Sequence, residues 1–330
     1  MTDLSRMSWS APAMPAAFRP AMAALAGLPP AYVGTALLLA CAAWLRPSLL
    51  SPMLLLLILR QAVPLGLAAL GQSLVMRARS LDLSSGGVIA AVAYLLTSGV
   101  LPLDAPAAIA VCLLFGLAVG ALNGVLVVGV RASAVIVTLS VSMILSGLVI
   151  AASQFHAPGE APQALRSVAL ARVEGVPLPV LAWAALLLPA ALFLRASVFG
   201  RTLDAVGANP RAAELSGLPY LLVVFLVHVA SGLLSALAGL LMLGFVGVGS
   251  VTLGSELALG SLAAAILGGI NFGSGRGGLL GPAAAAFMLA FLFNLLTSLG
   301  LGEAGRLMLQ GTLIVAAALA YSWRNRSGAH

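Results

Sequence analysis

The sequence contains no lysine, and all sixteen of its basic residues are arginine. A P-loop nucleotide site needs a lysine against the phosphates, and Schiff-base catalysis needs a lysine amine, so this chain can hold neither. If ATP drives the protein, another subunit therefore binds it. Charged residues of either sign make up only 8% of the 330 residues, against about 25% in soluble proteins, which excludes an ordinary soluble domain.

Cysteine is scarce too, since Cys41 and Cys112 are the only two and both lie inside apolar runs. The sequence has no CxxC motif and no His/Cys cluster, which are the usual signs of a zinc site or a redox pair. We therefore expect neither a disulfide nor a metal site, and we interpret both residues as small apolar side chains.

Carboxylates are few, with nine Asp and Glu residues in the whole chain. The interiors of the apolar runs contain almost none, because Asp82 and Glu256 both lie near the ends of runs. An ion-coupled carrier or channel, which is the alternative class of transporter, would place carboxylates within the membrane. No His/Asp/Glu cluster and no Ser/His/Asp set stands out, so we expect no enzymatic activity.

Long apolar runs are abundant. Hydrophobic residues form 62% of the chain, and its mean hydropathy is +1.13. We predict an all-α, polytopic membrane protein with about ten transmembrane helices, because runs near the length needed to cross a bilayer recur throughout. The third and eighth are short and rich in Gly and Ser, which is typical of broken or re-entrant helices. The predicted spans are 31–46, 51–75, 84–100, 106–130, 133–153, 178–195, 219–246, 256–271, 279–300 and 304–322.

The ends of the chain differ from its middle. Residues 1–30 are rich in Ala, Pro and Met with only short apolar stretches, so we expect a loosely ordered tail rather than a cleaved signal peptide. A transmembrane domain follows over 31–322, and 323–330 form a C-terminal tail. With the N-terminus in the cytoplasm, eleven of the sixteen arginines fall in cytoplasmic segments, as the positive-inside rule requires. Both termini are therefore expected in the cytoplasm. The outer segments then collect Asp104, Glu160, Glu174, Glu256 and Glu303.

A polar stretch, GRTLDAVGANPRAAELSGLPY, occupies residues 200–220 between two apolar runs. Asn209 suits the N-cap of a helix, Pro210 its first position and Gly217 the residue after its C-cap. The sequence therefore predicts a short helix over 211–216. So short a helix is marginal on its own, which leaves two interpretations: an ordinary capped loop helix, or a docking helix for a cytoplasmic partner.

This stretch resembles the cytoplasmic loop of the permease subunits of bacterial ATP-binding-cassette importers for monosaccharides, the ribose-type group of the branched-chain amino acid and sugar permeases. Further segments resemble other motifs of that group in the same order, so the resemblance covers about 31–322. These segments are SLDLSSGGVIAAVAYL (80–95), NGVLVVGVRASAVIVTLSVSMILSGLVI (123–150) and LGSELALGSLAAAILGGINFGSGRGGLLG (253–281).

The chain departs from the family pattern in several places. Arg79 and Ser80 stand where the group has a Gly-rich lead-in, and Ser133-Ala134 replaces a Pro-containing pair. Asn271 lies in the last segment, where the group has a different polar and aromatic pattern. We expect these departures to bear on the solute more than on the fold. Permeases for nucleosides, branched-chain amino acids or signalling sugars remain alternatives within the class.

The resemblance implies a permease of the bacterial inner membrane that works with several partners. These are a second permease copy or homologue, cytoplasmic ATPase subunits, a periplasmic solute-binding protein and membrane lipid, but no nucleic acid. ATP and Mg²⁺ would bind to the ATPase, and this chain would bind no cofactor. The loop 196–218 would carry the helix that couples the ATPase to transport. Its expected coupling residues are Gly207, Asn209, Pro210, Arg211, Ala212, Ala213, Glu214, Leu215, Ser216 and Gly217.

Polar residues at the edges of or inside the spans are candidates for a solute pathway or gate. Asp82 lies at a membrane boundary, which favours either a pathway role or helix capping by Asp82 or Ser84. A hydroxyl-rich solute needs dispersed polar contacts, and Ser140 and Ser142 are further sources of them. Arg60 and His228 lie within spans, and we interpret His228 as a packed residue. The pathway candidates are Asp82, Ser84, Ser85, Asn123, Thr138 and Asn271.

Gly116, Gly120 and Gly124 recur every fourth residue on one predicted helix. Such a GxxxGxxxG face lets another helix approach closely. The pattern predicts helix packing at this face, with a neighbour in the same subunit or, alternatively, with a second subunit in a dimer.

Overall fold

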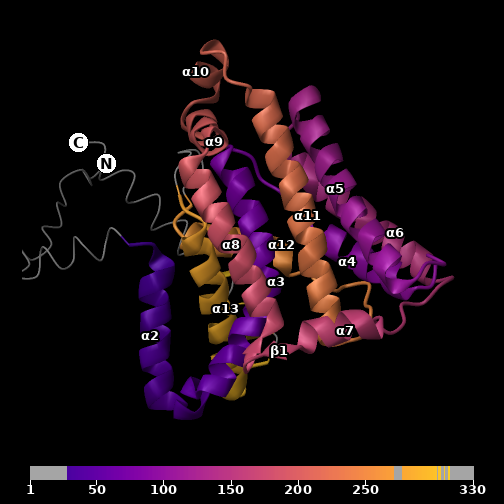
Figure 1. The fold of residues 1–330 in the computed structure, drawn as a ribbon, viewed down its shortest axis with the longest axis vertical. Coiled ribbons are helices and arrows are strands. Elements are labelled where there is room, and N and C mark those ends of the chain that lie inside the picture. The colour runs from indigo at the N-terminus through magenta and orange to yellow at the C-terminus, as the bar shows by residue number, and fades with distance from the viewer. Residues whose placement is uncertain (1–27, 271–276, 303, 306–307, 309–310, 313–330) are drawn as a thin grey trace, which may run out of the picture.

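The computed structural model describes residues 28–270, 277–302, 304–305, 308 and 311–312, and this part of the chain is almost entirely helical (Figure 1). The predicted tails at 1–30 and 323–330 and the predicted span 304–322 lie wholly or mostly outside these residues. The helices are α2 Pro30–Leu45, η3 Pro47–Leu50, α3 Pro52–Arg77, α4 Ser85–Thr97, α5 Ala105–Gly129, α6 Ala134–Ser153, α7 Gln163–Leu170, α8 Leu178–Ala196, α9 Val198–Ala208, α10 Pro210–Leu215, α11 Tyr220–Val246, α12 Leu257–Leu267 and α13 Leu280–Ser298.

A small antiparallel hairpin interrupts this helical architecture. Its strands are β1, Arg172–Val173, and β2, Val176–Pro177, and they pair with Arg172 opposite Pro177. The hairpin and α7 lie at the end of the bundle opposite α10 (Figure 1).

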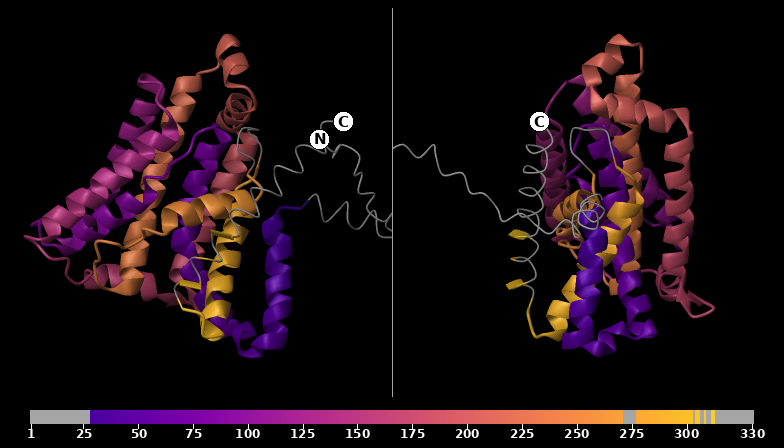
Figure 2. Two further views of the ribbon diagram at one scale, coloured as in Figure 1. Left: turned by 180° about the vertical axis from the view of Figure 1, so that it is seen from behind. Right: turned by 90° about the vertical axis from the view of Figure 1, so that its left-hand side faces the viewer.

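Six helices are long and apolar enough to cross a membrane, namely α3, α5, α6, α8, α11 and α13. Three further apolar helices, α2, α4 and α12, are shorter. The 11 residues of α12 rise only about 17 Å along the helix axis, whereas a bilayer core is about 30 Å thick. The short, Gly/Ser-rich runs at 84–100 and 256–271 thus form short helices, and so does the run at 31–46, which we expected to span. From behind, α12 is seen to lie across the long helices (Figure 2).

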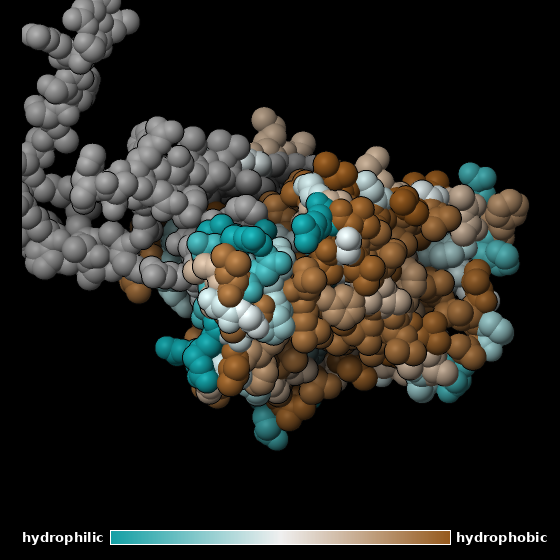
Figure 3. All heavy atoms as spheres, turned by 90° about the horizontal axis from the view of Figure 1, so that it is seen from above, coloured by the Kyte–Doolittle hydropathy of each residue, from teal (hydrophilic) through white to brown (hydrophobic). Residues whose placement is uncertain are grey.

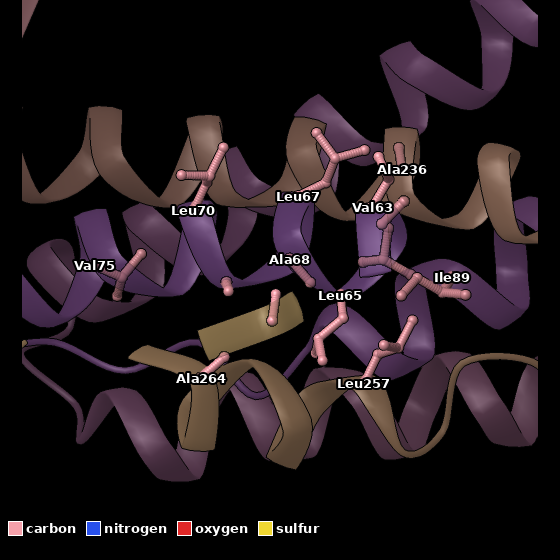
Figure 4. Close-up of a cluster of buried hydrophobic side chains, with 14 of the residues drawn as sticks. Val63, Leu65, Leu67, Ala68, Leu70, Val75, Ile89, Ala236, Leu257 and Ala264 are labelled. Carbon is pink, nitrogen blue, oxygen red and sulfur yellow. The ribbon is translucent and has the colours of Figure 1, made fainter. Parts of the chain in front are cut away.

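The core is built around α3. This helix is apolar on all sides and contacts α8, α11, α12 and α13, and a helix of that kind is stable only when other helices cover it. Its second half is buried without a break from Ala62 to Ser73. Figure 4 shows Val63 and Leu67 on the side of α11, near Ala236, and Leu65 on the side of α12, near Leu257.

The polar segment 196–218 contains more regular structure than the sequence predicts. Besides the short helix α10, it forms the 11-residue α9 at 198–208, which we took for loop. The Ser197 side chain caps α9 by accepting a hydrogen bond from the Gly200 amide at 3.1 Å. Viewed from this end, the largest group of hydrophilic side chains forms one patch, smaller groups lie at the edges of the view, and hydrophobic side chains cover most of the remaining visible surface (Figure 3).

Candidate functional site

The helix α10 is closed at both ends by its own sequence. Asn209 Oδ1 accepts a hydrogen bond from the Ala212 amide at 3.1 Å, and Pro210 is the first helical residue. At the other end Gly217 has a φ of 77°, in the left-handed region, and the Leu218 amide returns to Ala213 O at 3.0 Å. This is a Schellman motif, so the backbone groups at both ends of α10 are largely satisfied locally.

The outer surface of α10 carries both charge and apolar area. Ala213 is buried against the bundle. Arg211 and Glu214 form an exposed ion pair at 2.8 Å, and such a pair contributes only about 0.2–0.5 kcal/mol to the helix. Leu215 is 73% exposed. This combination of an exposed leucine and a weak exposed ion pair is suited to contact with another protein surface.

Two arginines that follow each other closely at the end of α3 hold α9 in place. Arg77 forms a hydrogen-bonded ion pair with Asp204. Arg79 Nε donates to Gly207 O at 2.7 Å, and Arg79 Nη2 donates to Ala208 O at 2.9 Å. None of these contacts was predicted from the sequence. The pairing of Arg77 with Asp204 had a usable signal, because both residues fall on the predicted cytoplasmic side, where acidic residues are scarce.

Four of the predicted pathway residues lie close together at the start of α4. Asp82 Oδ1 accepts hydrogen bonds from the Ser84 amide at 2.9 Å and the Ser84 hydroxyl at 2.6 Å. Asn123 Nδ2 of α5 donates to Ser84 Oγ at 2.8 Å, and Thr138 Oγ1 of α6 accepts from the Leu83 amide at 2.9 Å. All four polar side chains are buried. The polar cluster therefore connects the start of α4 to the two neighbouring helices α5 and α6. The side chain of Ser84, the N-cap residue, accepts no hydrogen bond from an amide of α4.

The cluster has unused hydrogen-bonding capacity. Within the described residues, Asp82 Oδ2, Ser85 Oγ and Asn123 Oδ1 are buried without a hydrogen-bond partner. A buried polar atom left unpaired costs about 1–3 kcal/mol, so these atoms favour the approach of another polar group. Asn271, the sixth candidate, lies outside the described residues.

A half-open cavity of about 260 Å³ lies next to the cluster, between α4, α6 and α12. Its polar lining comes from Ser142 and Ser146 of α6 and from Thr252 and Ser255 before α12. The predicted residues Asp82, Ser84, Ser85, Asn123 and Thr138 do not line it. Thr138 nevertheless contacts the cavity wall, because it accepts a hydrogen bond from the amide of Leu83, which is a lining residue.

Most of the polar lining was not among the predicted site residues. Thr138, Ser142 and Ser146 are four residues apart, so they share one face of α6. That spacing was a usable signal, and it separates them from Ser140, which is exposed on another face. Ser142 Oγ also accepts a hydrogen bond from the Gly87 amide at 3.2 Å, which sets the distance between α6 and α4.

Gly116, Gly120 and Gly124 all face α11 of the same chain. A Cβ atom on Gly120 would lie 2.4 Å from His228 O, and one on Gly116 would lie 2.6 Å from Gly232 O. These two helices share the most extensive contact of any pair among the described elements. The glycine face is thus filled within the subunit, and a dimer interface has no room there.

Comparison with known proteins gives consistent similarities. A family model described as "Branched-chain amino acid transport system / permease component" matches residues 54–318. The ribose import permease protein RbsC of Escherichia coli K12 is 30% identical over 267 residues, which is 79% of this chain and 83% of that protein. The autoinducer 2 import system permease protein LsrD of Klebsiella pneumoniae is 30% identical over 281 residues, which is 82% of this chain and 84% of that protein. No solved structure matches the chain.

Proposed function

The chain belongs to the family of branched-chain amino acid transport system permease components, and from this premise we propose that it is the membrane-spanning permease of an ATP-binding-cassette importer. We propose a monosaccharide or a related small polar molecule as the solute, because the relatives named for ribose and autoinducer 2 import align with most of the chain. In this proposal the protein lies in the bacterial inner membrane, with about ten transmembrane segments, of which α4 and α12 are short and enter the bilayer without crossing it, and with both termini in the cytoplasm.

The observation that carries the proposal is the construction of α10. Its caps fold it locally, its inner face rests on the bundle through Ala213, and its outer face presents Arg211, Glu214 and Leu215. A membrane protein has little reason to expose such a helix unless another protein binds it. We assign that role to a cytoplasmic ATPase subunit, which binds ATP and Mg²⁺, since this chain has no lysine for a P-loop.

We place the solute pathway in the cavity between α4, α6 and α12. The serine and threonine hydroxyls that line it can form a few weak hydrogen bonds to a hydroxyl-rich solute, which suits a solute that passes through the cavity without being retained. The outward face of α6 beside the cavity is largely exposed, so we propose that a second permease copy closes the cavity from that side. A periplasmic binding protein would then deliver the solute at the α7 end and set the selectivity.

Copurification tests the docking role of α10. We expect Glu214→Arg to reduce the recovery of a candidate ABC ATPase from the same organism by more than about tenfold, because it places two positive charges side by side on the docking face. Glu174→Arg is the matched control, since it reverses an exposed acid in the hairpin at the opposite end and should leave recovery unchanged. Equal recovery with both variants would remove the support for α10 as the docking helix.

Transport into proteoliposomes tests the whole proposal. The permease, the ATPase and a binding protein should together move radiolabelled ribose only when ATP is present on the ATPase side. The permease alone should hydrolyse no ATP. Hydrolysis by the purified chain, or ribose uptake driven by an ion gradient without the ATPase, would contradict the assignment and favour a self-contained carrier.

A further inference from the structure

Arg79 has an unusual backbone conformation. Its φ is 58°, in the left-handed region that favours glycine. It lies in the short segment 78–84 that connects the end of α3 to the start of α4. A long side chain persists in this region only where the surrounding structure holds it there, so the contacts of the guanidinium are informative.

The guanidinium holds the last turn of α9. Two of its hydrogen bonds go to Gly207 O and Ala208 O, and the carbonyl end of a helix favours a cation. Asn209 follows immediately in an extended conformation, with a φ of −154°, and separates α9 from α10. Arg79 therefore binds the backbone directly before the proposed docking helix.

A second attachment lies about one helical turn earlier on α9. Arg77, almost completely buried at the end of α3, pairs with the half-exposed Asp204. One bond alone would let α9 turn about the point of contact. Together the two arginines fix α9 at two points along its length, so a displacement of α9 is passed to the segment that carries Arg79.

In the other direction along the chain, Arg79 lies four residues before Leu83, which lines the cavity. Ser80 Oγ hydrogen-bonds His228 Nε2 of α11 at 3.2 Å. Leu83 donates its amide to Thr138 of α6 and lines the cavity. The connecting segment is thus bonded to α11 through Ser80 and to α6, which lines the cavity, through Leu83. It is short, so a movement at Arg79 reaches Leu83.

We propose that Arg79 is the positioning residue that passes the motion of α9 and α10 to segment 80–84 and so to the cavity wall at Leu83. The inference rests on the proposed function, because it takes the ATPase as the source of the motion. Arg79 touches no solute in this role. A loop attached only through its chain ends would bend when α10 is displaced, whereas the guanidinium bonds make the connecting segment move with α9.

The chain offers a matched pair of substitutions. Arg131, between α5 and α6, is also left-handed with a φ of 56° and is exposed, and within the described residues it forms no hydrogen bond or ion pair. Arg79→Gly and Arg131→Gly each remove one positive charge and relieve the same backbone strain, so neither should impair folding. Arg79→Lys keeps the charge at position 79 but cannot donate to both carbonyls in the arginine geometry.

Amide hydrogen exchange on the purified full-length permease tests the contact without any partner. We expect Arg79→Gly to speed exchange in a peptide covering 203–209 by about tenfold, because the helix end loses its anchor. Arg79→Lys should give an intermediate rate, and Arg131→Gly should match the unmodified protein. Equal protection of this peptide in all proteins would overturn the inference.

Coupled transport tests the consequence. In proteoliposomes that contain permease, ATPase and binding protein, we expect Arg79→Gly to lower the ribose moved per ATP hydrolysed by about tenfold, which is a typical size for coupling between sites. Arg131→Gly should retain the ratio of the unmodified complex. An unchanged ratio with Arg79→Gly would overturn the inference while leaving the proposed function intact. If the unmodified complex does not form or transport, the proposed function fails, and hydrogen exchange alone then decides whether Arg79 anchors α9.

Discussion

The helices α11 and α6 have equal mean hydropathy, yet their surroundings differ. In the most apolar window of α11, 50% of the residues are buried inside the subunit, against 17% in α6. The difference follows from small residues. Gly232 of α11 lies so close to α5 that an added Cβ would come within 2.2 Å of Gly116 O, whereas a Cβ on Gly147 of α6 would meet nothing within 4 Å.

The comparison separates two properties that hydropathy combines. Apolar composition takes a helix into the membrane, but close packing between helices there depends on small residues and on polar contacts. By this criterion α11 is a structural helix of the subunit, and α6 is a boundary helix between the cavity, the polar cluster and whatever covers its outer face.

The largest expected effect comes from filling the contact between α5 and α11. Gly120→Leu would force its side chain into the backbone of α11 at His228, and overpacking of this kind costs about 3 kcal/mol. We expect loss of monodisperse protein in detergent and a lower midpoint in denaturant titration. Gly147→Leu on α6 is the control and should leave the midpoint unchanged, so equal destabilisation by both would invalidate the distinction between the two helices.

The next largest effect should be on transport. Ser142→Leu fills the cavity beside Gly87 and removes the acceptor of the Gly87 amide, so we expect ribose uptake to fall more than about tenfold, together with a loss of about 1–3 kcal/mol of stability. Ser140→Leu places the same side chain on the exposed face of α6 and should retain uptake. If both variants transport normally, the pathway does not run through this cavity.

A smaller effect should follow from removing a single hydroxyl in the polar cluster. Thr138→Val keeps the shape of the side chain but leaves the Leu83 amide without its acceptor, which costs about 1–2 kcal/mol. Ser140→Val is the matched change on α6, where the hydroxyl is exposed, and should be neutral or slightly stabilising. Thermal unfolding of the two variants in the same detergent measures the difference.

The smallest expected effect concerns the outer face of α6. In a Cys41→Ser background, Met143→Cys replaces a side chain that is 68% exposed, and it should form a disulfide-linked dimer in native membranes if a second copy covers this face. Leu114→Cys on α5, which replaces a side chain that is 62% exposed, should not. Crosslinking at Leu114 instead of Met143 would move the proposed interface to α5.

Much of the fold could be predicted because helix positions follow from local composition. The predicted spans from 31–46 to 279–300 agree with α2 to α13 within a few residues at most ends, and the caps of α10 were readable because Asn209, Pro210 and Gly217 act over short distances. Residues 198–208 were mistaken for loop, since α9 is short and is held by tertiary contacts with Arg77 and Arg79 rather than by its own composition.

The candidate site was predicted only in part, for a related reason. Polar residues in apolar runs are conspicuous, so Asp82, Asn123 and Thr138 could be identified as a group of interest. Which of them face a cavity depends on how α4, α6 and α12 pack together, and this is a long-range property. Thr252 and Ser255, which do line the cavity, lie in a loop whose composition carries no comparable signal.

The caps of α10 have a consequence for how the protein can change over time. Ten consecutive residues, 209–218, contain nearly everything that makes this helix fold, and only Ala213 is buried within it. Substitutions at Arg211, Glu214 or Leu215 therefore change the surface that a partner meets without disturbing the membrane bundle. In the proposed complex, partner choice and membrane folding would be encoded in separate stretches of this chain, so one could diverge while the other stays constant.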